Sequence, residues 1–124
     1  MIAQTLALLL SLGAPQADEL ADSSDPRIVI RSYDPGEVVT LPVTLGYAAV
    51  VELSSEERVE SVIVGNSTAW QVSTNRRGDR VVVKPLSEIP TNMVVITDSR
   101  RYVFLLEPAS GGMSPLVLHF TYPA

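Results

Sequence analysis

The chain has 124 residues, of which 46% are hydrophobic and 19% are charged, and its formal net charge is −5. This length suits one domain, and the hydrophobic fraction is too high for an intrinsically disordered chain. Nine Lys and Arg residues against fourteen Asp and Glu residues provide no positive stripe for a phosphate backbone, which disfavours direct nucleic-acid binding. The absence of cysteine excludes disulfides, thiolate metal sites and a cysteine nucleophile.

Residues 1–22 differ in composition from the rest of the chain. Residues 6–10 form an apolar run, and small residues gather at positions 13–17. This run is shorter than the about 20 residues that a membrane-spanning helix needs, but it suits the apolar region of a signal peptide. The preceding segment departs from that pattern because it has no Lys or Arg. We predict a signal peptide and flexible arm in residues 1–22 and one domain in residues 23–124, with a disordered or amphipathic N-terminal arm as the alternative.

The remaining sequence is a series of short apolar runs separated by turn residues. The expected strands cover residues 27–33, 37–43, 47–53, 59–64, 69–73, 80–84, 91–97, 102–106 and 115–122. Short strands at spacings of roughly 8–12 residues are typical of all-β sandwiches and barrels. We therefore predict a single antiparallel β-sandwich of eight to nine strands. Pro42 cannot donate a ladder hydrogen bond, so its strand is expected at a sheet edge or to end near this residue.

The segment from 91 to 106 is the clearest hairpin in the sequence. Two runs rich in β-branched and aromatic residues flank the polar connection 98–101. We expect Val94, Ile96 and Phe104 to face the core. Residues 93–96 and the valines at 81–83 are apolar at consecutive positions, so both faces of these strands should be covered, by a second sheet or by a neighbouring subunit.

No residue pattern indicates catalysis, a cofactor or a metal. The single histidine, His119, lies in an alternating strand, where a surface or half-buried position is the simpler interpretation. Adjacent Glu56 and Glu57 are expected in a solvated loop, pointing in different directions. The segment 65–69 lacks the second glycine of a nucleophile elbow and is interpreted as a turn. An enzyme is therefore disfavoured, and a hydrolase would need an unrecognised role for His119 or Glu57.

Candidate binding residues are aromatic or cationic. Trp70 is the only tryptophan, and a core position is favoured over a ligand platform. Two arginine pairs in separate connections, Arg76 with Arg77 and Arg100 with Arg101, are candidates for salt bridges to a partner protein.

The chain from 25 to 123 resembles the CagX/TrbG-type conjugal transfer proteins, which are outer-membrane core components of type IV secretion systems. The matching residues are Tyr33, the segment 57–65, Trp70, Gly78, the segment 81–85 with Lys84 and Pro85, Thr91 and Asn92, Arg100 to Tyr102, Phe104 and the closing segment 118–123. Their order and spacing are more specific than any one of them.

This resemblance implies a periplasmic, non-enzymatic β-sandwich without a cofactor. Such a domain packs beside many copies of itself in a ring and beside an inner-membrane-spanning core protein, and the complex associates with the outer membrane. Family members usually carry a second β-domain that contacts a small outer-membrane lipoprotein, and the linker to it would begin near Ala124, so the resemblance extends less firmly to that partner. An alternative class is a periplasmic ligand-binding module or adhesin that uses Trp70 and Tyr102 as a platform.

Overall fold

The computed structural model describes residues 24–124, which form nine β-strands and no helix. The strands are β1 (Ile28–Ser32), β2 (Val38–Thr44), β3 (Ala49–Glu52), β4 (Val59–Val64), β5 (Trp70–Thr74), β6 (Arg80–Pro85), β7 (Thr91–Thr97), β8 (Arg101–Ala109) and β9 (Val117–Thr121). The described range therefore contains no helix long and apolar enough to cross a membrane. The predicted signal peptide lies outside the described residues.

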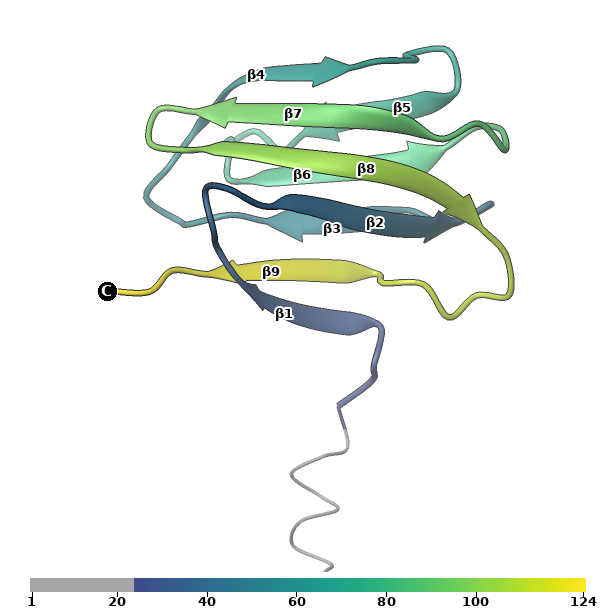
Figure 1. The fold of residues 1–124 in the computed structure, drawn as a ribbon, viewed down its shortest axis with the longest axis horizontal. Coiled ribbons are helices and arrows are strands. Elements are labelled where there is room, and N and C mark those ends of the chain that lie inside the picture. The colour runs from purple at the N-terminus through teal and green to yellow at the C-terminus, as the bar shows by residue number, and fades with distance from the viewer. Residues whose placement is uncertain (1–23) are drawn as a thin grey trace, which may run out of the picture.

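Two sheets pack face to face as a sandwich (Figure 1). The five-stranded sheet has the order β1-β9-β3-β6-β5, and the four-stranded sheet has the order β2-β8-β7-β4. This confirms the all-β sandwich and the number of strands. The expectation of purely antiparallel pairing was wrong in detail, because β1 with β9, β2 with β8, and β3 with β9 pair in parallel. All three parallel pairs join strands far apart in the chain, so turn residues carry no information about them.

Strand β2 lies at an edge of the four-stranded sheet, as Pro42 predicts. Only β8 pairs with it, and Pro42 stands opposite Glu107 in the register. Because one side of an edge strand has no ladder, the missing N–H of a proline costs no pairing there.

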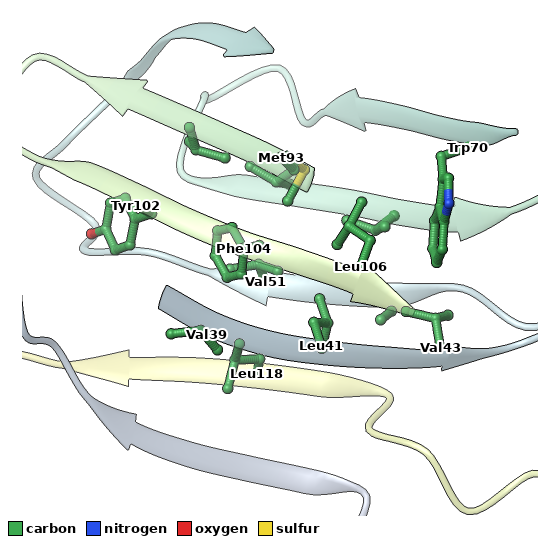
Figure 2. Packing of buried hydrophobic residues seen from close by; sticks show 14 of the residues in the cluster. Val39, Leu41, Val43, Val51, Trp70, Met93, Tyr102, Phe104, Leu106 and Leu118 are labelled. Atoms are coloured by element: carbon green, nitrogen blue, oxygen red, sulfur yellow. The ribbon is translucent and has the colours of Figure 1, made fainter. Parts of the chain in front are cut away.

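The core lies between the sheets (Figure 2). Strand β8 directs Tyr102, Phe104 and Leu106 inward, and all three are buried. They meet side chains from the five-stranded sheet, such as Val51 and Leu118. Burial of apolar side chains contributes roughly 25 cal/mol per Å², so this interface supplies the main stabilisation of a chain without disulfides.

The side chains of β7 that face the core are not the ones predicted from the sequence. Met93 and Val95 are fully buried and Thr97 is nearly so, whereas Ile96 is 36% exposed and Val94 is only partly covered. The core assignment was thus correct for Phe104 and wrong for Val94 and Ile96. Because side chains alternate between faces, a shift of one residue exchanges the two sets. Four consecutive apolar residues show no alternation, and only pairing with β4 and β8 decides which set is buried.

Candidate functional site

The most elaborate polar arrangement in the structure surrounds Glu57, in the connection between β3 and β4. Glu57 is 1% exposed, whereas its neighbour Glu56 is exposed. The two carboxylates point in different directions, as expected, but the solvated-loop interpretation was wrong for Glu57. A buried carboxylate requires compensating hydrogen bonds or a cation.

Both carboxylate oxygens of Glu57 accept hydrogen bonds from within the chain. The Thr97 hydroxyl donates to Oε2 at 2.7 Å, and the Ser54 backbone N–H donates to Oε1 at 3.1 Å. The Tyr102 hydroxyl also donates to Oε1, and the Tyr122 hydroxyl lies 3.1 Å from the same oxygen. The donors come from both sheets and from the loop itself, so the carboxylate joins the two layers at one end of the sandwich.

Arg100 provides the cation for this cluster. Its Nη1 lies 3.3 Å from Oε1 of Glu57. The guanidinium carbon stands 3.9 Å from the ring centroid of Tyr122 and 5.5 Å from that of Tyr33, within the range of cation–π attraction. Tyr33 in turn donates its hydroxyl to the Arg101 carbonyl at 3.0 Å. We call these residues the Glu57 cluster: Tyr33, Glu57, Thr97, Arg100, Tyr102 and Tyr122.

The cluster stabilises the ionised form of Glu57. Burial acts to raise the pKa of this carboxyl, but the hydrogen bonds from Tyr102, Thr97 and Ser54, together with Arg100, outweigh it and hold the pKa below its usual value. Burial and the hydrogen bond to Glu57 raise the pKa of Tyr102. Burial raises the pKa of Tyr122 to about 12. At neutral pH an ionised Glu57 and the Arg100 guanidinium therefore lie beside the neutral phenols of Tyr102 and Tyr122, an arrangement suited to holding loops in place.

Sequence reasoning missed Glu57, although a local signal was present. Ser54 and Glu57 have the spacing of a capping box, in which the two residues bond each other reciprocally. Here the Glu57 side chain accepts from the Ser54 N–H, and the Glu57 N–H donates to the Ser54 carbonyl at 3.1 Å. The Ser54–Glu57 spacing predicts a bent loop. The hydrogen-bond partners of Glu57 on distant strands can be identified only from the folded structure.

The structure separates the four candidate interface arginines. Arg100 is bound within the Glu57 cluster and is not free to pair with a partner. Arg76, Arg77 and Arg101 are exposed. Arg77 makes one loose ion pair, with its Nε 3.5 Å from Oδ2 of Asp79. Three of the four predicted residues therefore remain available for contacts with another chain.

Trp70 and Tyr102 do not form an exposed platform. They are 2% and 3% exposed, and Figure 2 shows both pointing into the core from different strands. The indole N–H of Trp70 donates to the Ile89 carbonyl at 2.7 Å. These positions favour the core interpretation of Trp70, and they argue against the ligand-binding alternative, which needs open ring faces.

Other family-like residues support the fold where β4 meets β7. The Thr91 hydroxyl accepts from the Asn66 N–H at 2.8 Å, and the Asn92 carbonyl accepts from the Gly65 N–H at 3.1 Å. A Cβ on Gly65 would meet the side-chain oxygens of Asn92 and Thr91, so glycine permits this approach. Phe104 is buried in the core. Lys84 is exposed and Pro85 is buried, both in β6.

His119 lies on the outer surface of the five-stranded sheet. Its Nδ1 is 3.0 Å from Oε1 of Glu52, whose other oxygen lies 3.4 Å from Nε of Arg80. These residues border a depression of about 430 Å³ between the β3–β4 connection and the end of β9. Within residues 24–124, no group of three or more His, Cys, Asp or Glu side chains is arranged to hold a metal ion.

The match to a known family has nearly the same boundaries as the sandwich. The family model described as "CagX: Conjugal transfer protein" matches residues 26–124. The type IV secretion system protein virB9 of Bartonella henselae is 32% identical over 110 residues, covering 80% of this chain and 38% of the relative. Protein virB9 of Agrobacterium fabrum is 34% identical over 108 residues, covering 81% of this chain and 36% of the relative.

Among solved structures, the thioester domain of the Staphylococcus aureus TIE protein aligns over 79% of this chain and 50% of the chain of that domain. Its TM-score is 0.35 and its identity is 12%, which are too low to support an inference. The two virB9 relatives are matched over little more than a third of their length, so the likeness applies to one domain. From the match over nearly all described residues, the chain belongs to the CagX family of conjugal transfer proteins.

Proposed function

We propose that this chain is a structural, non-enzymatic subunit of a type IV secretion or conjugation core complex. The observation that carries the proposal is the family match over residues 26–124, together with 32% identity to a protein named as a type IV secretion component. The fold supports it, because a rigid sandwich with an internally bonded polar cluster suits a building block. In this role the chain packs with further copies of itself in a ring and beside an inner-membrane-spanning core protein.

The exposed arginines offer contacts for such an assembly. Arg58 links the turn between β5 and β6 to the β7–β8 hairpin: its Nη1 donates to the Arg77 carbonyl, and its own carbonyl accepts from the Asp98 N–H at 3.0 Å. The turn that carries Arg76 and Arg77 therefore lies at the same end of the sandwich as the hairpin that precedes Arg101. Arginines at an interface rim favour correct docking through charge complementarity.

The proposed location is the periplasm, with attachment to the outer membrane through the complex. It fits the signal peptide predicted for residues 1–22. A small outer-membrane lipoprotein is a further partner of such complexes. We assign no residue of this domain to that contact, since the match covers only 38% and 36% of the two virB9 relatives.

Deleting the gene in its native host tests the role directly. We expect loss of secretion or conjugal transfer, restored by the wild-type gene in trans, and co-purification of a tagged chain with a larger envelope complex. Unchanged transfer in the deletion strain, or recovery of monomer only while the secretion genes are expressed, would overturn the proposal.

Complementation with arginine variants tests the contact residues. Arg76→Ala combined with Arg77→Ala should weaken recovery in the complex without lowering the thermal stability of the domain, because both side chains are exposed. Gln71→Ala, an exposed change on the neighbouring strand β5, is the matched control and should behave as wild type. Equal recovery of all variants would remove this arginine pair from the interface.

A further inference from the structure

The outer face of the four-stranded sheet, turned away from the core, carries a band of aliphatic side chains flanked by polar ones such as Thr40, Ser61 and Asn92. A row of aliphatic side chains crosses all four strands in register. Val38 of β2 stands opposite Val103 of β8, Val103 opposite Val94 of β7, and Val94 opposite Ile63 of β4. Val38 is 53% exposed and Ile63 is 49% exposed. The row is therefore continuous and open to solvent at both ends.

Two further side chains extend this row into a patch. Leu105 follows Val103 on the same face of β8 and is 44% exposed, and Ile96 follows Val94 on β7 and is 36% exposed. We call the six residues Val38, Ile63, Val94, Ile96, Val103 and Leu105 the outer aliphatic patch. Contiguous exposed apolar patches of more than a few hundred Å² are typical of contact surfaces.

Charges on β8 border this patch in a self-complementary order. Arg101, Val103, Leu105 and Glu107 all point outward, since they alternate with buried or half-buried residues of the same strand. The sequence along this face is therefore cation, aliphatic, aliphatic, anion. Neither Arg101 nor Glu107 belongs to an ion pair within the described part of the chain. A two-fold axis through the middle of β8 would exchange Arg101 with Glu107 and Val103 with Leu105.

We infer that a second copy of this chain packs on the outer aliphatic patch, with its β8 antiparallel to the first. Arg101 of each copy then faces Glu107 of the other, and the two aliphatic rows are buried between them. Sheets that pack face to face keep their strands nearly aligned, which this arrangement allows. Both charge pairs form together only in the two-fold arrangement, so the charge order selects one orientation.

The size of the face indicates a weak, reversible dimer. Four strands spaced about 4.8 Å apart and about 20 Å long present roughly 400 Å² per copy, half of the about 800 Å² per partner that stable complexes bury. A two-fold pair closes on itself, whereas a ring requires a contact between two different surfaces. The dimer is therefore a separate state of the free chain, and it does not rest on the proposed function.

Sedimentation equilibrium of the full chain at increasing concentration tests the pairing. We expect a concentration-dependent dimer for the wild type. R101E alone and E107R alone should each lower the association constant at least tenfold, since each places like charges opposite each other twice. The double variant R101E/E107R should recover most of the association. E88R, a charge reversal in the exposed β6–β7 connection, is the control and should dimerise as wild type.

Mixing the two single variants gives a second readout. Each fails to pair with itself, but R101E has two anions where E107R has two cations, so an equimolar mixture should form a heterodimer. Circular dichroism confirms that each variant is folded. A wild type that stays monomeric at millimolar concentration, association insensitive to both reversals, larger oligomers in place of a dimer, or a mixture that fails to associate would each overturn the inference.

Discussion

The hydroxyl oxygens of Tyr102 and Tyr122 lie 2.6 Å apart. Tyr102 belongs to β8 of the four-stranded sheet, and Tyr122 directly follows β9 of the five-stranded sheet. Their shared contact with Glu57 Oε1 therefore holds the two sheets together near the point where the chain leaves the sandwich. The hydrogen bonds within a buried polar cluster depend on one another, which makes the Glu57 cluster sensitive to the loss of any one member.

Removing the carboxylate should destabilise the domain strongly. Glu57→Ala leaves the hydroxyls of Thr97 and Tyr102 without their acceptor and opens a cavity, so we expect the free energy of unfolding to fall by about 2–4 kcal/mol. Glu56→Ala, one residue away and exposed, should change it by less than about 0.5 kcal/mol. Urea denaturation of both variants measures the difference. Similar small losses in both would show that the cluster contributes little to stability.

Stability should fall on acidification because of Glu57. The pKa of Glu57 is lowered in the folded state. Its contribution to the free energy of unfolding is therefore complete well above the ordinary carboxyl pKa of about 4.3, and it is lost as the pH falls from that value through the lower pKa of the folded state. Asp79 acts with the same sign, since a hydrogen bond from Asn75 lowers its pKa. Urea denaturation between pH 7 and pH 3 should show a shallower pH dependence for Glu57→Gln than for wild type. Identical dependence would assign acid sensitivity to other groups.

Trp70 should behave as a core residue. Trp70→Ala removes a fully buried ring and is expected to lower the free energy of unfolding by about 3–5 kcal/mol. Trp70→Phe retains much of the apolar volume but leaves the Ile89 carbonyl without its donor, so a smaller loss of about 1–3 kcal/mol is expected. Thermal and urea unfolding measure both. An unchanged stability of Trp70→Ala would favour a binding role for the indole instead.

Neighbouring valines on β7 should respond differently to the same change. Val95→Thr places a hydroxyl in the closed core, at an expected cost of about 1–3 kcal/mol, whereas Val94→Thr places it on the outer face at less than about 0.5 kcal/mol. Each variant is the control for the other because size and shape are nearly conserved. The reverse order of stability would contradict the orientation of this strand.

Local features of the sequence determined where the strands lie. Turn residues and short β-branched runs depend only on near neighbours, so the nine strands and the edge position of β2 were predictable, the latter because Pro42 lacks a donor. Arg76 and Arg77 were correctly expected on an exposed connection, whereas Arg101, also expected on a connection, is the exposed first residue of β8. The family was recognisable from the order of these same elements along the chain.

Tertiary structure alone decided which strands pair in parallel, which face of β7 is buried, and how Glu57 and Arg100 are used. The run from Met93 to Ile96 is apolar at every position, so no alternation distinguishes the core face from the outer aliphatic patch. Glu57 is buried because Thr97, Arg100, Tyr102 and Tyr122 reach it from distant parts of the chain. The physical reason is the same in both cases: the free energy of burying a side chain depends on partners that folding brings together.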